Sequence, residues 1–518
     1  MKMFQTKYKI VTCIIAVGLF LLIAVTPALA QFQRVIEDFR VNDDPLGNNR
    51  PHMDPVIACD SKGCFVIAWQ DARNGTKKAW DYDIYAQRYD SGGQALGANF
   101  RVNDDGPDNY QTMPQIAMSD SGEYIIVWTD GRNDFDIYAQ RYDRNGNTIG
   151  TNFQLNEFDS ATQAQGDIGL DSIGGFVVAW RDDRNGNGDI YVRRFNADGT
   201  AKDTSCKVND DTVNTLNWYP RIAVGRDGRF IVTWEDYRRE AIGYVNPDMY
   251  AQRYNNIGSK IGGNWLVNTD AGDNNQGVPV VAISRGNNFV ISWSDARPGG
   301  TGIYAQWYDS AGAALGINFK VSDSSIINTS DVAYDSIGNF LICWEQGDYD
   351  DLFAQRYNNI GLKIGNNFNV DDIPLTSHVH PAVTSYSESN YIFTWQDSRS
   401  NGNWDIWANK WGNYTGVEGI PDNSYNVKEI KLSAYPNPCI DKIILSYDLP
   451  YNGLVSISIY DIIGRKIKTL YTGWPGVGCK SNIWHLTNDQ GKAVGNGIYL
   501  CDFKFNGQQI VKRITVMR

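Results

Sequence analysis

The sequence predicts an all-β chain, in which a seven-bladed β-propeller is followed by a small β-sandwich. Three observations support this prediction. One sequence unit recurs along most of the chain, each unit contains four short strand patterns separated by turns, and a different strand pattern replaces the repeat before the C-terminus. No stretch shows sustained helical periodicity.

The repeat is marked by one tryptophan in every unit. A unit reads Pro-x-Ile-Ala, a turn of the Asp-Ser-x-Gly type, Phe-Val-Val-Ala-Trp-x-Asp-x-Arg, a variable loop, Asp-Ile-Tyr-Ala-Gln-Arg-Tyr-Asp, a Gly-rich turn and Phe-x-Val-Asn. The anchor tryptophans are 51 to 59 residues apart: Trp69, Trp128, Trp180, Trp234, Trp293, Trp344 and Trp395. Because they recur in every unit, we interpret them as the core between blades rather than as one site.

The Trp-x-Asp-x-Arg motif also repeats. It occurs in six of the seven units and fails only at Trp344-Glu345-Gln346. A catalytic residue is needed once, not six times. We therefore interpret these Asp and Arg side chains as contacts that fix turns or join blades.

The two ends of the repeat complement each other. Strands of the Phe-x-Val-Asn type begin at Phe39, Phe100, Phe153, Cys206, Trp265, Phe319 and Phe368. The first precedes the first anchor tryptophan, and none follows the last unit. We therefore predict that the N-terminal strand completes the seventh blade, which closes the ring and protects its edges.

The N-terminus predicts export. Three lysines precede an uncharged apolar run at residues 10–25, and Ala28-Leu29-Ala30 forms a small-x-small cleavage site. We predict a signal peptide over residues 1–30, cleaved between Ala30 and Gln31. A retained anchor is the weaker alternative, because a membrane-spanning helix needs roughly 20 residues. No later segment is long and apolar enough to span a membrane, so none is expected after cleavage.

The charge is unevenly distributed. The chain has a net charge of −12, yet residues 425–518 hold twelve Lys and Arg against six Asp and Glu. The body before them is therefore strongly acidic. This balance disfavours nucleic acid and anionic membranes as partners, and it is compatible with cations, sugars or basic protein patches.

The cysteines leave two interpretations open. Cys59 and Cys64 flank a four-residue turn, so they are a candidate disulfide across a hairpin, or else two small buried residues. The chain has no Cys-x-x-Cys motif and only four histidines, so a zinc site is disfavoured.

The repeat gives way to other motifs near the C-terminus. We assign the propeller to residues 31–412, a Gly-, Asn- and Ser-rich linker to 413–428, and a second domain to 429–518. That domain opens with Tyr435-Pro436-Asn437-Pro438 and continues with Ile459-Tyr460-Asp461-Ile462-Ile463-Gly464-Arg465, Gly497-Ile498-Tyr499 and a basic–apolar end. Alternating residues and regular turns predict a sandwich of short strands.

These C-terminal motifs resemble the type A C-terminal sorting domain of the type IX secretion system, which is similar to an immunoglobulin-like sandwich. The sequence departs from the family at Trp484-His485-Leu486, where Trp-Asp-Gly is frequent. The resemblance implies recognition by a type IX-like export machinery, passage through the periplasm, and a final place outside the cell or on its surface. The repeat resembles uncharacterised exported bacterial β-propellers, which supports the fold only.

Long, variable loops are predicted on one face of the propeller, where the second strand joins the third and the outer strand joins the next blade. Variable loops on a rigid scaffold often carry binding residues. The candidate ligand contacts are non-repeated aromatic residues in or beside these loops: Trp80, Tyr82, Tyr110, Trp218, Tyr219, Tyr244 and Trp404. Together with the Asp and Asn of the loops, they suit an extracellular carbohydrate or protein. We therefore predict a binding protein.

Two other features are weaker candidates. Calcium is the one cofactor considered, with Asp183, Asn185, Asn187 and Asp189 at alternate positions, although Arg194 stands where the bidentate Glu of a calcium loop belongs. The alternative function is a propeller glycoside hydrolase or lyase that uses the non-repeated acids Glu157, Glu235, Glu240 and Glu345. No Ser-His-Asp order, His-Glu-x-x-His motif or P-loop is present, so we assign no catalytic residue.

Overall fold

The computed structural model describes residues 31–45, 50–75, 82–106, 109–157, 161–212, 215–239, 243, 246–270, 272, 274–323, 329–347, 351–371, 373, 376–400, 403–414, 432–449, 455–473, 478–505 and 508–517. The chain forms two compact units, Met1–Gly416 and Val417–Arg518. The described parts of both units are built from β-strands, with short 3-10 turns at η1 (Gly131–Asn133) and at Arg238 and Arg239.

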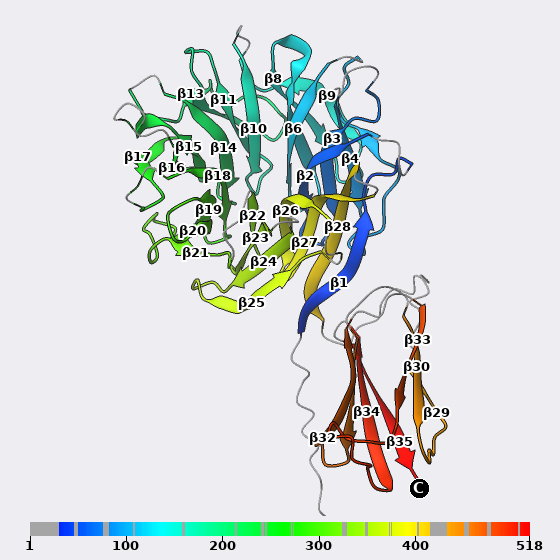
Figure 1. Ribbon diagram of the computed structural model, residues 1–518. Coiled ribbons are helices and arrows are strands. Elements are labelled where there is room, and N and C mark those ends of the chain that lie inside the picture. The colour runs from blue at the N-terminus through cyan, green and yellow to red at the C-terminus, as the bar shows by residue number, and fades with distance from the viewer. Residues whose placement is uncertain are drawn as a thin grey trace, which may run out of the picture. The chain divides into compact units, whose positions relative to one another are not determined.

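The first unit is a β-propeller of seven four-stranded antiparallel sheets (Figure 1). In six blades the strands follow one another in chain order. Three of these blades are β2 (His52–Cys59), β3 (Phe65–Asp71), β4 (Asp83–Tyr89), β5 (Phe100–Arg101); β6 (Gln111–Met118), β7 (Tyr124–Asp130), β8 (Asp136–Tyr142), β9 (Thr148–Gln154); and β10 (Gln163–Leu170), β11 (Phe176–Asp182), β12 (Asp189–Phe195), β13 (Cys206–Lys207). The next three are β14 (Asn217–Val224), β15 (Phe230–Asp236), β16 (Asp248–Tyr254), β17 (Lys260–Leu266); β18 (Gln276–Ile283), β19 (Phe289–Asp295), β20 (Gly302–Tyr308), β21 (Phe319–Lys320); and β22 (Ser330–Tyr334), β23 (Phe340–Gln346), β24 (Asp351–Tyr357), β25 (Lys363–Asn369).

The seventh blade joins the two ends of the propeller. It contains β26 (His378–Ser387), β27 (Asn390–Ser400), β28 (Asn403–Tyr414) and, as its outer strand, β1 (Gln31–Arg40). β1 pairs antiparallel with β28, with Gln31 opposite Tyr414 and Arg40 opposite Trp407. The predicted closure by the N-terminal strand is confirmed. β28 extends past the boundary predicted at residue 412.

The repeated motif holds each blade together. All seven anchor tryptophans are fully buried. In six blades the indole N–H donates to the motif aspartate over 2.7 to 2.9 Å, as Trp69 does to Asp71. The motif arginine binds the same carboxylate: Arg73 Nε donates to Asp71 over 2.9 Å, and its guanidinium lies 4.3 Å from the ring centre of Tyr85. Arg73 also pairs with Asp43, at the end of the preceding blade, so the motif fixes a turn and joins two blades.

The second unit is a β-sandwich. One sheet has the order β29 (Ser433–Tyr435), β30 (Ile443–Leu449) and β33 (Gly478–Trp484). The other has the order β32 (Lys466–Gly473), β31 (Val455–Asp461), β34 (Gly497–Phe505) and β35 (Gln508–Val516). Both sheets contribute to one core, in which Leu445 and Trp484 of the first sheet pack with Ile457, Phe503 and Ile514 of the second. The predicted sandwich is therefore present.

The ends of the predicted segments are only partly covered. Residues 1–30, and most of the predicted linker, lie outside the described residues, and β1 begins at Gln31. Within the parts of the chain that the structure covers, no helix has the length and apolar character to cross a membrane.

The candidate disulfide is not formed. Cys59 and Cys64 are both free thiols. The β2–β3 ladder places Cys59 opposite Phe65 rather than opposite Cys64, and Cys59 Sγ lies 3.3 Å from Thr384 Oγ1 of the seventh blade. Burial raises the pKa of the Cys59 thiol to about 12. The alternative of two small residues without a bridge describes the structure, although both side chains are only partly buried.

Candidate functional site

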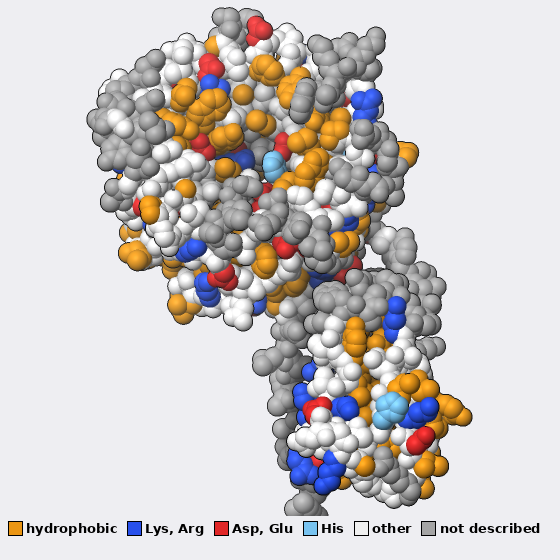
Figure 2. Space-filling view, viewed as in Figure 1, with side chains coloured by type: hydrophobic (Ala, Val, Ile, Leu, Met, Phe, Trp, Pro, Cys, Tyr) orange, Lys and Arg blue, Asp and Glu red, His pale blue; other side chains and the backbone are white. Residues whose placement is uncertain are grey.

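The first strands of the blades surround a central cavity. They contact one another around the ring, from β2 through β26 and back to β2. The cavity has a volume of about 540 Å³, and its lining comes from the early residues of these inner strands. Inner strands begin on the face that carries the long loops, so the cavity lies at the face where binding is predicted. Figure 2 shows a hollow at the centre of the propeller, where a histidine and charged side chains of both signs gather.

Six of the inner strands carry the same β-bulge, which builds an upper ring of cavity residues. In each strand one non-glycine residue has a φ between 49° and 58°: Asp54, Met113, Gln165, Tyr219, Val278 and His380. The inner strand of the sixth blade, β22, pairs with β23 without a bulge. Such a backbone costs about 1–3 kcal/mol for each residue unless the surroundings hold it in place.

The preceding blade holds each bulge in place. The residue that follows the anchor tryptophan accepts the N–H of the upper-ring residue in the next blade. These bonds run from Met113 to Gln70 (2.9 Å), Gln165 to Thr129 (3.1 Å), Val278 to Glu235 (2.7 Å), His380 to Glu345 (2.5 Å) and Asp54 to Gln396 (3.2 Å). Arg181, which follows the third anchor, has no acceptor, and Tyr219 N donates instead to Gln165 Oε1 over 3.0 Å.

The residues of the upper ring share a backbone conformation but differ in their side chains. Its members include an acid, a histidine, a tyrosine, an amide and apolar residues. Asp54 and His380 form an ion pair across the junction of the first and seventh blades. Burial would lower the pKa of His380, but the hydrogen bond and charge of Asp54 outweigh it, so this pKa is raised. Tyr219 is 41% exposed.

A lower ring lies two residues further along each inner strand: Val56, Gln115, Asp167, Arg221, Val280, Asp331 and Ala382, six of which follow a bulge. Its carboxylates tie neighbouring blades together. Asp167 accepts the N–H of Ile222 over 2.8 Å, and Asp331 accepts the N–H of Val383 over 2.7 Å. Burial raises the pKa of both carboxyls, to about 6 for Asp331.

The four non-repeated acids have different surroundings. Glu235 and Glu345 support the upper ring. Burial raises the pKa of Glu235 to about 7. Glu157 is tied to the neighbouring outer strand instead, where its carboxylate accepts from Ser205 N over 2.8 Å. Glu240 lies outside the described residues.

The aromatic residues predicted to contact a ligand do not gather at one site in the described structure. Tyr219 lines the cavity. Trp218 is half-buried, with the Arg181 guanidinium 3.9 Å from its ring centre, and Tyr110 is half-buried beside Tyr82. Trp404 is half-buried, and Trp80 and Tyr244 lie outside the described residues. Tyr82 is 3% exposed, so the prediction that it contacts a ligand is corrected: it packs into the first blade.

The four residues of the calcium prediction are engaged in contacts of their own. Asn185 Nδ2 donates to Asp189 over 2.7 Å, and Asn187 Nδ2 donates to the carbonyl of Thr215 over 2.8 Å. Asp189 is further paired with Lys207, and Asp183 with Arg181, both at 2.7 Å. These contacts place amide N–H groups and cations where a calcium site needs oxygen ligands.

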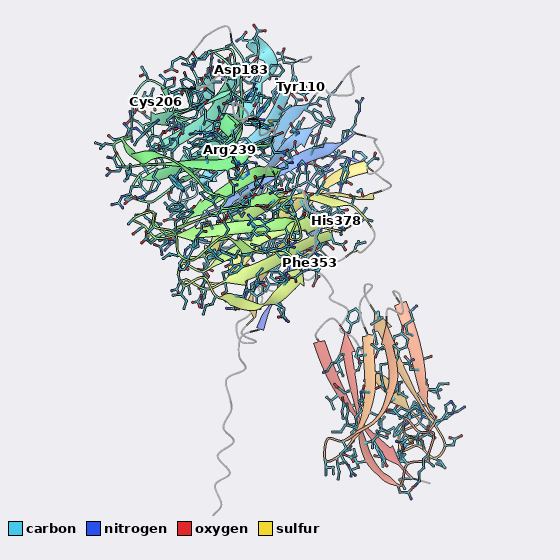
Figure 3. All side chains as sticks on the ribbon, turned by 60° about the vertical axis from the view of Figure 1, so that its left-hand side comes forward. Tyr110, Asp183, Cys206, Arg239, Phe353 and His378 are labelled. Atoms are coloured by element: carbon cyan, nitrogen blue, oxygen red, sulfur yellow. The ribbon has the colours of Figure 1, made fainter. Side chains whose placement is uncertain are left out.

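Two groups elsewhere, buried except for the half-buried Asp351, have side chains that suit a metal: Asp44, His52 and Asp405, and Asp351, Asp371 and His378. Tyr110, Asp183 and His378 are labelled in Figure 3 and belong to different blades. Both groups occupy a junction between blades that recurs around the ring. Between the first and second blades, Asn103 Nδ2 donates to Asp83 over 2.7 Å and to Gln111 over 3.1 Å. In the two groups above, His52 and His378 occupy the position equivalent to Gln111, at the start of the inner strand. We interpret both groups as polar joints.

The His378 joint predicts a dependence of stability on pH. Burial would lower the pKa of His378, but its contact with Asp397, at 3.2 Å, and the charge of Asp371 outweigh it, so the pKa is raised. A raised pKa means that the folded state binds the proton more tightly. The stabilisation is complete below about pH 6.5, the value for an unfolded chain, and is lost as the pH rises through the folded value.

We therefore expect the free energy of unfolding to fall more steeply between pH 6 and 9 in the unaltered protein than in His378→Gln. Three other junctions hold glutamine at this position, at Gln111, Gln163 and Gln276, so the variant should fold. Urea denaturation across this range measures the difference. Parallel pH profiles for the two proteins would contradict the prediction.

The sequence carries a signal for the cavity residues in the prolines of the repeat. Five upper-ring residues directly precede a proline, at Pro55, Pro114, Pro220, Pro279 and Pro381. The proline recurs in the repeat, whereas the residue before it changes from unit to unit. A position that varies beside a constant one marks the place where the repeat is diversified.

Comparison with known proteins identifies the C-terminal unit. Residues 433–517 match the secretion system C-terminal sorting domain. The chain therefore carries the sorting domain of the type IX system, which interacts with its export machinery and directs the protein to the cell surface or extracellular space. No curated protein matches the chain.

Several solved structures resemble the propeller. A protein of unknown function from Dyadobacter fermentans is 10% identical, with 74% of this chain and 99% of that chain covered and a TM-score of 0.46. An ulvan lyase of a new polysaccharide lyase family is 11% identical, with 71% and 96% covered and a TM-score of 0.45. A Penicillium chrysogenum α-L-arabinanase is 16% identical, with 58% and 93% covered and a TM-score of 0.42.

The sorting domain makes export of a fused reporter testable. Residues 429–518 contain all strands of the sandwich and its shared core. In a type IX-competent host, a periplasmic reporter joined to this segment should reach the surface or the medium. The control reporter carries residues 413–428 alone and should stay in the periplasm. Retention of both, in a host that exports its own substrates, would show that the segment is insufficient.

Proposed function

We propose that the propeller is the ligand-binding part of this exported protein and that it takes a saccharide in the central cavity. The observation that carries the proposal is the upper ring. Six equivalent, unfavourable backbone positions recur, five of them held by the same supporting hydrogen bond, yet their side chains differ. A fold that repeats its supports and varies what they present has the character of a recognition surface.

The cavity suits a compact polar ligand. Its volume of about 540 Å³ falls within the range of small-molecule sites rather than flat protein interfaces. Tyr219 offers an aromatic face for the C–H face of a sugar ring, while Gln165 and His380 offer hydrogen-bonding groups for hydroxyls. Met113 and Val278 supply apolar surface beside them. A protein segment inserted into the cavity is the competing ligand.

A glycan array and a pull-down from extracellular proteins, both with residues 31–518, test the proposal. Tyr219→Ala should weaken saccharide binding by about 5- to 150-fold, because a stacking contact of this kind is worth about 1–3 kcal/mol. The matched control is Ile173→Ala, at an exposed apolar residue in a short turn of the opposite face. Protein capture without glycan binding, or equal binding by both variants, would refute saccharide recognition in the cavity.

A glycoside hydrolase or lyase is the alternative that Glu235 favours. Its raised pKa, about 7, suits a general acid at neutral pH, and its charge acts on the nearby Tyr219. Cleavage products formed from any glycan that binds, and lost in Glu235→Gln, would establish this function in place of simple binding.

A further inference from the structure

The lower ring contains an arginine whose hydrogen-bonding capacity is unused. Arg221 is half-buried and lines the central cavity. Its Nε atom is buried and has no hydrogen-bond partner. In the described part of the propeller, no hydrogen bond or ion pair reaches its guanidinium. A guanidinium has five donors, and a partly buried charge without a partner is unfavourable. The motif arginines differ, because each binds an aspartate, as Arg238 binds Asp236.

The aspartates of the lower ring do not fill this gap. Asp167 accepts from Ile168 N over 2.9 Å and from Ile222 N over 2.8 Å. Asp331 accepts from Val332 N over 2.8 Å and from Val383 N over 2.7 Å. Each carboxylate oxygen thus already accepts a backbone N–H that ties two blades or fixes its own strand. Both aspartates act on Arg221 only through longer-range charge.

The upper ring adds donors above Arg221. His380 presents Nδ1 to Asp54, which leaves Nε2 for another partner. Among the described residues, neither this atom nor the Tyr219 hydroxyl makes a hydrogen bond. Both residues line the same cavity as Arg221. The unfilled polar capacity of the cavity is therefore mainly that of donors, which a ligand with an acidic group would fill.

We propose that Arg221 binds the carboxylate or sulfate group of an acidic saccharide seated in the central cavity. The proposal rests on the proposed saccharide-binding function and names its ligand class. A planar guanidinium pairs with a carboxylate or a sulfate through two parallel hydrogen bonds. Because the body of the chain is acidic, a polyanion is repelled at long range. The ligand is therefore a short saccharide, or a chain end, with one acidic group.

The experiment compares matched trisaccharides by calorimetry on residues 31–518. The panel contains trisaccharides of galactose, glucose and mannose, each with a terminal residue that is neutral, oxidised to the uronate, or sulfated at O6. An acidic member should bind more tightly than its neutral counterpart, and the uronate and sulfate arms separate the two sources of charge. Arg221→Gln should weaken acidic binding by about 10- to 150-fold, the range expected for hydrogen bonds to a charged group. Neutral binding should change little.

Two controls separate this role from a structural one. Arg226→Gln makes the same change in the turn that follows the same strand, where Arg226 is exposed and paired with Asp120, and should leave binding unaltered. Arg221→Lys keeps the charge but loses the planar fork, and should bind with intermediate affinity. The Tm of Arg221→Gln should not fall, because the change removes an unpaired charge.

Three results would overturn the proposal. Equal affinity for neutral and acidic probes, or equal losses of affinity for both in Arg221→Gln, would refute recognition of an acidic group. The proposed saccharide binding, with its dependence on Tyr219, would still stand. A large fall in Tm for Arg221→Gln, with unchanged selectivity, would make the arginine structural. Failure of the whole panel to bind would overturn it together with the proposed function.

Discussion

Removal of residues 31–43 is expected to lower the Tm of the propeller by on the order of 10 °C or more. The deletion takes away β1 and leaves the edge of the seventh blade without a partner. Phe32 packs against Phe368 and Trp411, with ring centres 5.4 and 5.7 Å away. Arg34 donates to the carbonyl of Val370 in the sixth blade over 2.9 Å. The strand therefore contributes to two blades, and its loss exposes apolar rings and backbone groups together.

The deletion also breaks a joint between the first and seventh blades. Asn42 Nδ2 donates to Asp405 of the seventh blade over 2.7 Å and lies 3.3 Å from His52 Nδ1 of the first blade. Differential scanning calorimetry of residues 31–518 and 44–518 measures the effect. Val35→Ala is the matched control, because Val35 lies on β1 but is 43% exposed and should change the Tm little. A truncated protein that melts like the intact one would show that the ring does not depend on this strand.

Sequence reasoning succeeded where the repeat itself carried the information. Trp180 and its equivalents recur at blade spacing, and a large apolar residue in every unit has to pack between units. The displaced strand at Phe39 indicated closure for the same reason, since one strand was surplus at one end and missing at the other. The sorting domain was predicted from motifs such as Tyr435-Pro436-Asn437-Pro438, and residues 433–517 confirm it.

Sequence reasoning failed where position depends on how the backbone turns. Tyr82 directly follows a long loop and looked exposed, but it is the residue before β4 and packs inward, with its hydroxyl donating to Met53 Sδ over 3.2 Å. The Asn side chains after Asp183 looked like calcium ligands, but an amide can turn its N–H group outward and donate. A β-bulge such as that at Asp54 changes which face a side chain occupies, and alternation in the sequence does not reveal it.

The contrast between repeated and non-repeated residues gives the sharpest test of this fold. Trp180 is fully buried, its Nε1 donates to Asp182 over 2.9 Å, and its ring packs against Tyr191 at 6.4 Å. Trp180→Ala should therefore cost about 3–5 kcal/mol through lost burial and a cavity, a large part of the 5–15 kcal/mol that typically stabilises a domain.

Tyr219→Ala should behave in the opposite way. Its side chain is 41% exposed and lines the cavity, so its removal should change the free energy of unfolding by no more than about 0.5 kcal/mol. Its backbone stays supported, because the bond from Tyr219 N to Gln165 does not involve the phenol ring. Guanidinium denaturation of both variants, beside the glycan-binding assay, separates stability from recognition. Equal losses of stability would mean that the upper ring is part of the core, since a residue that only recognises a ligand leaves the unliganded fold unchanged.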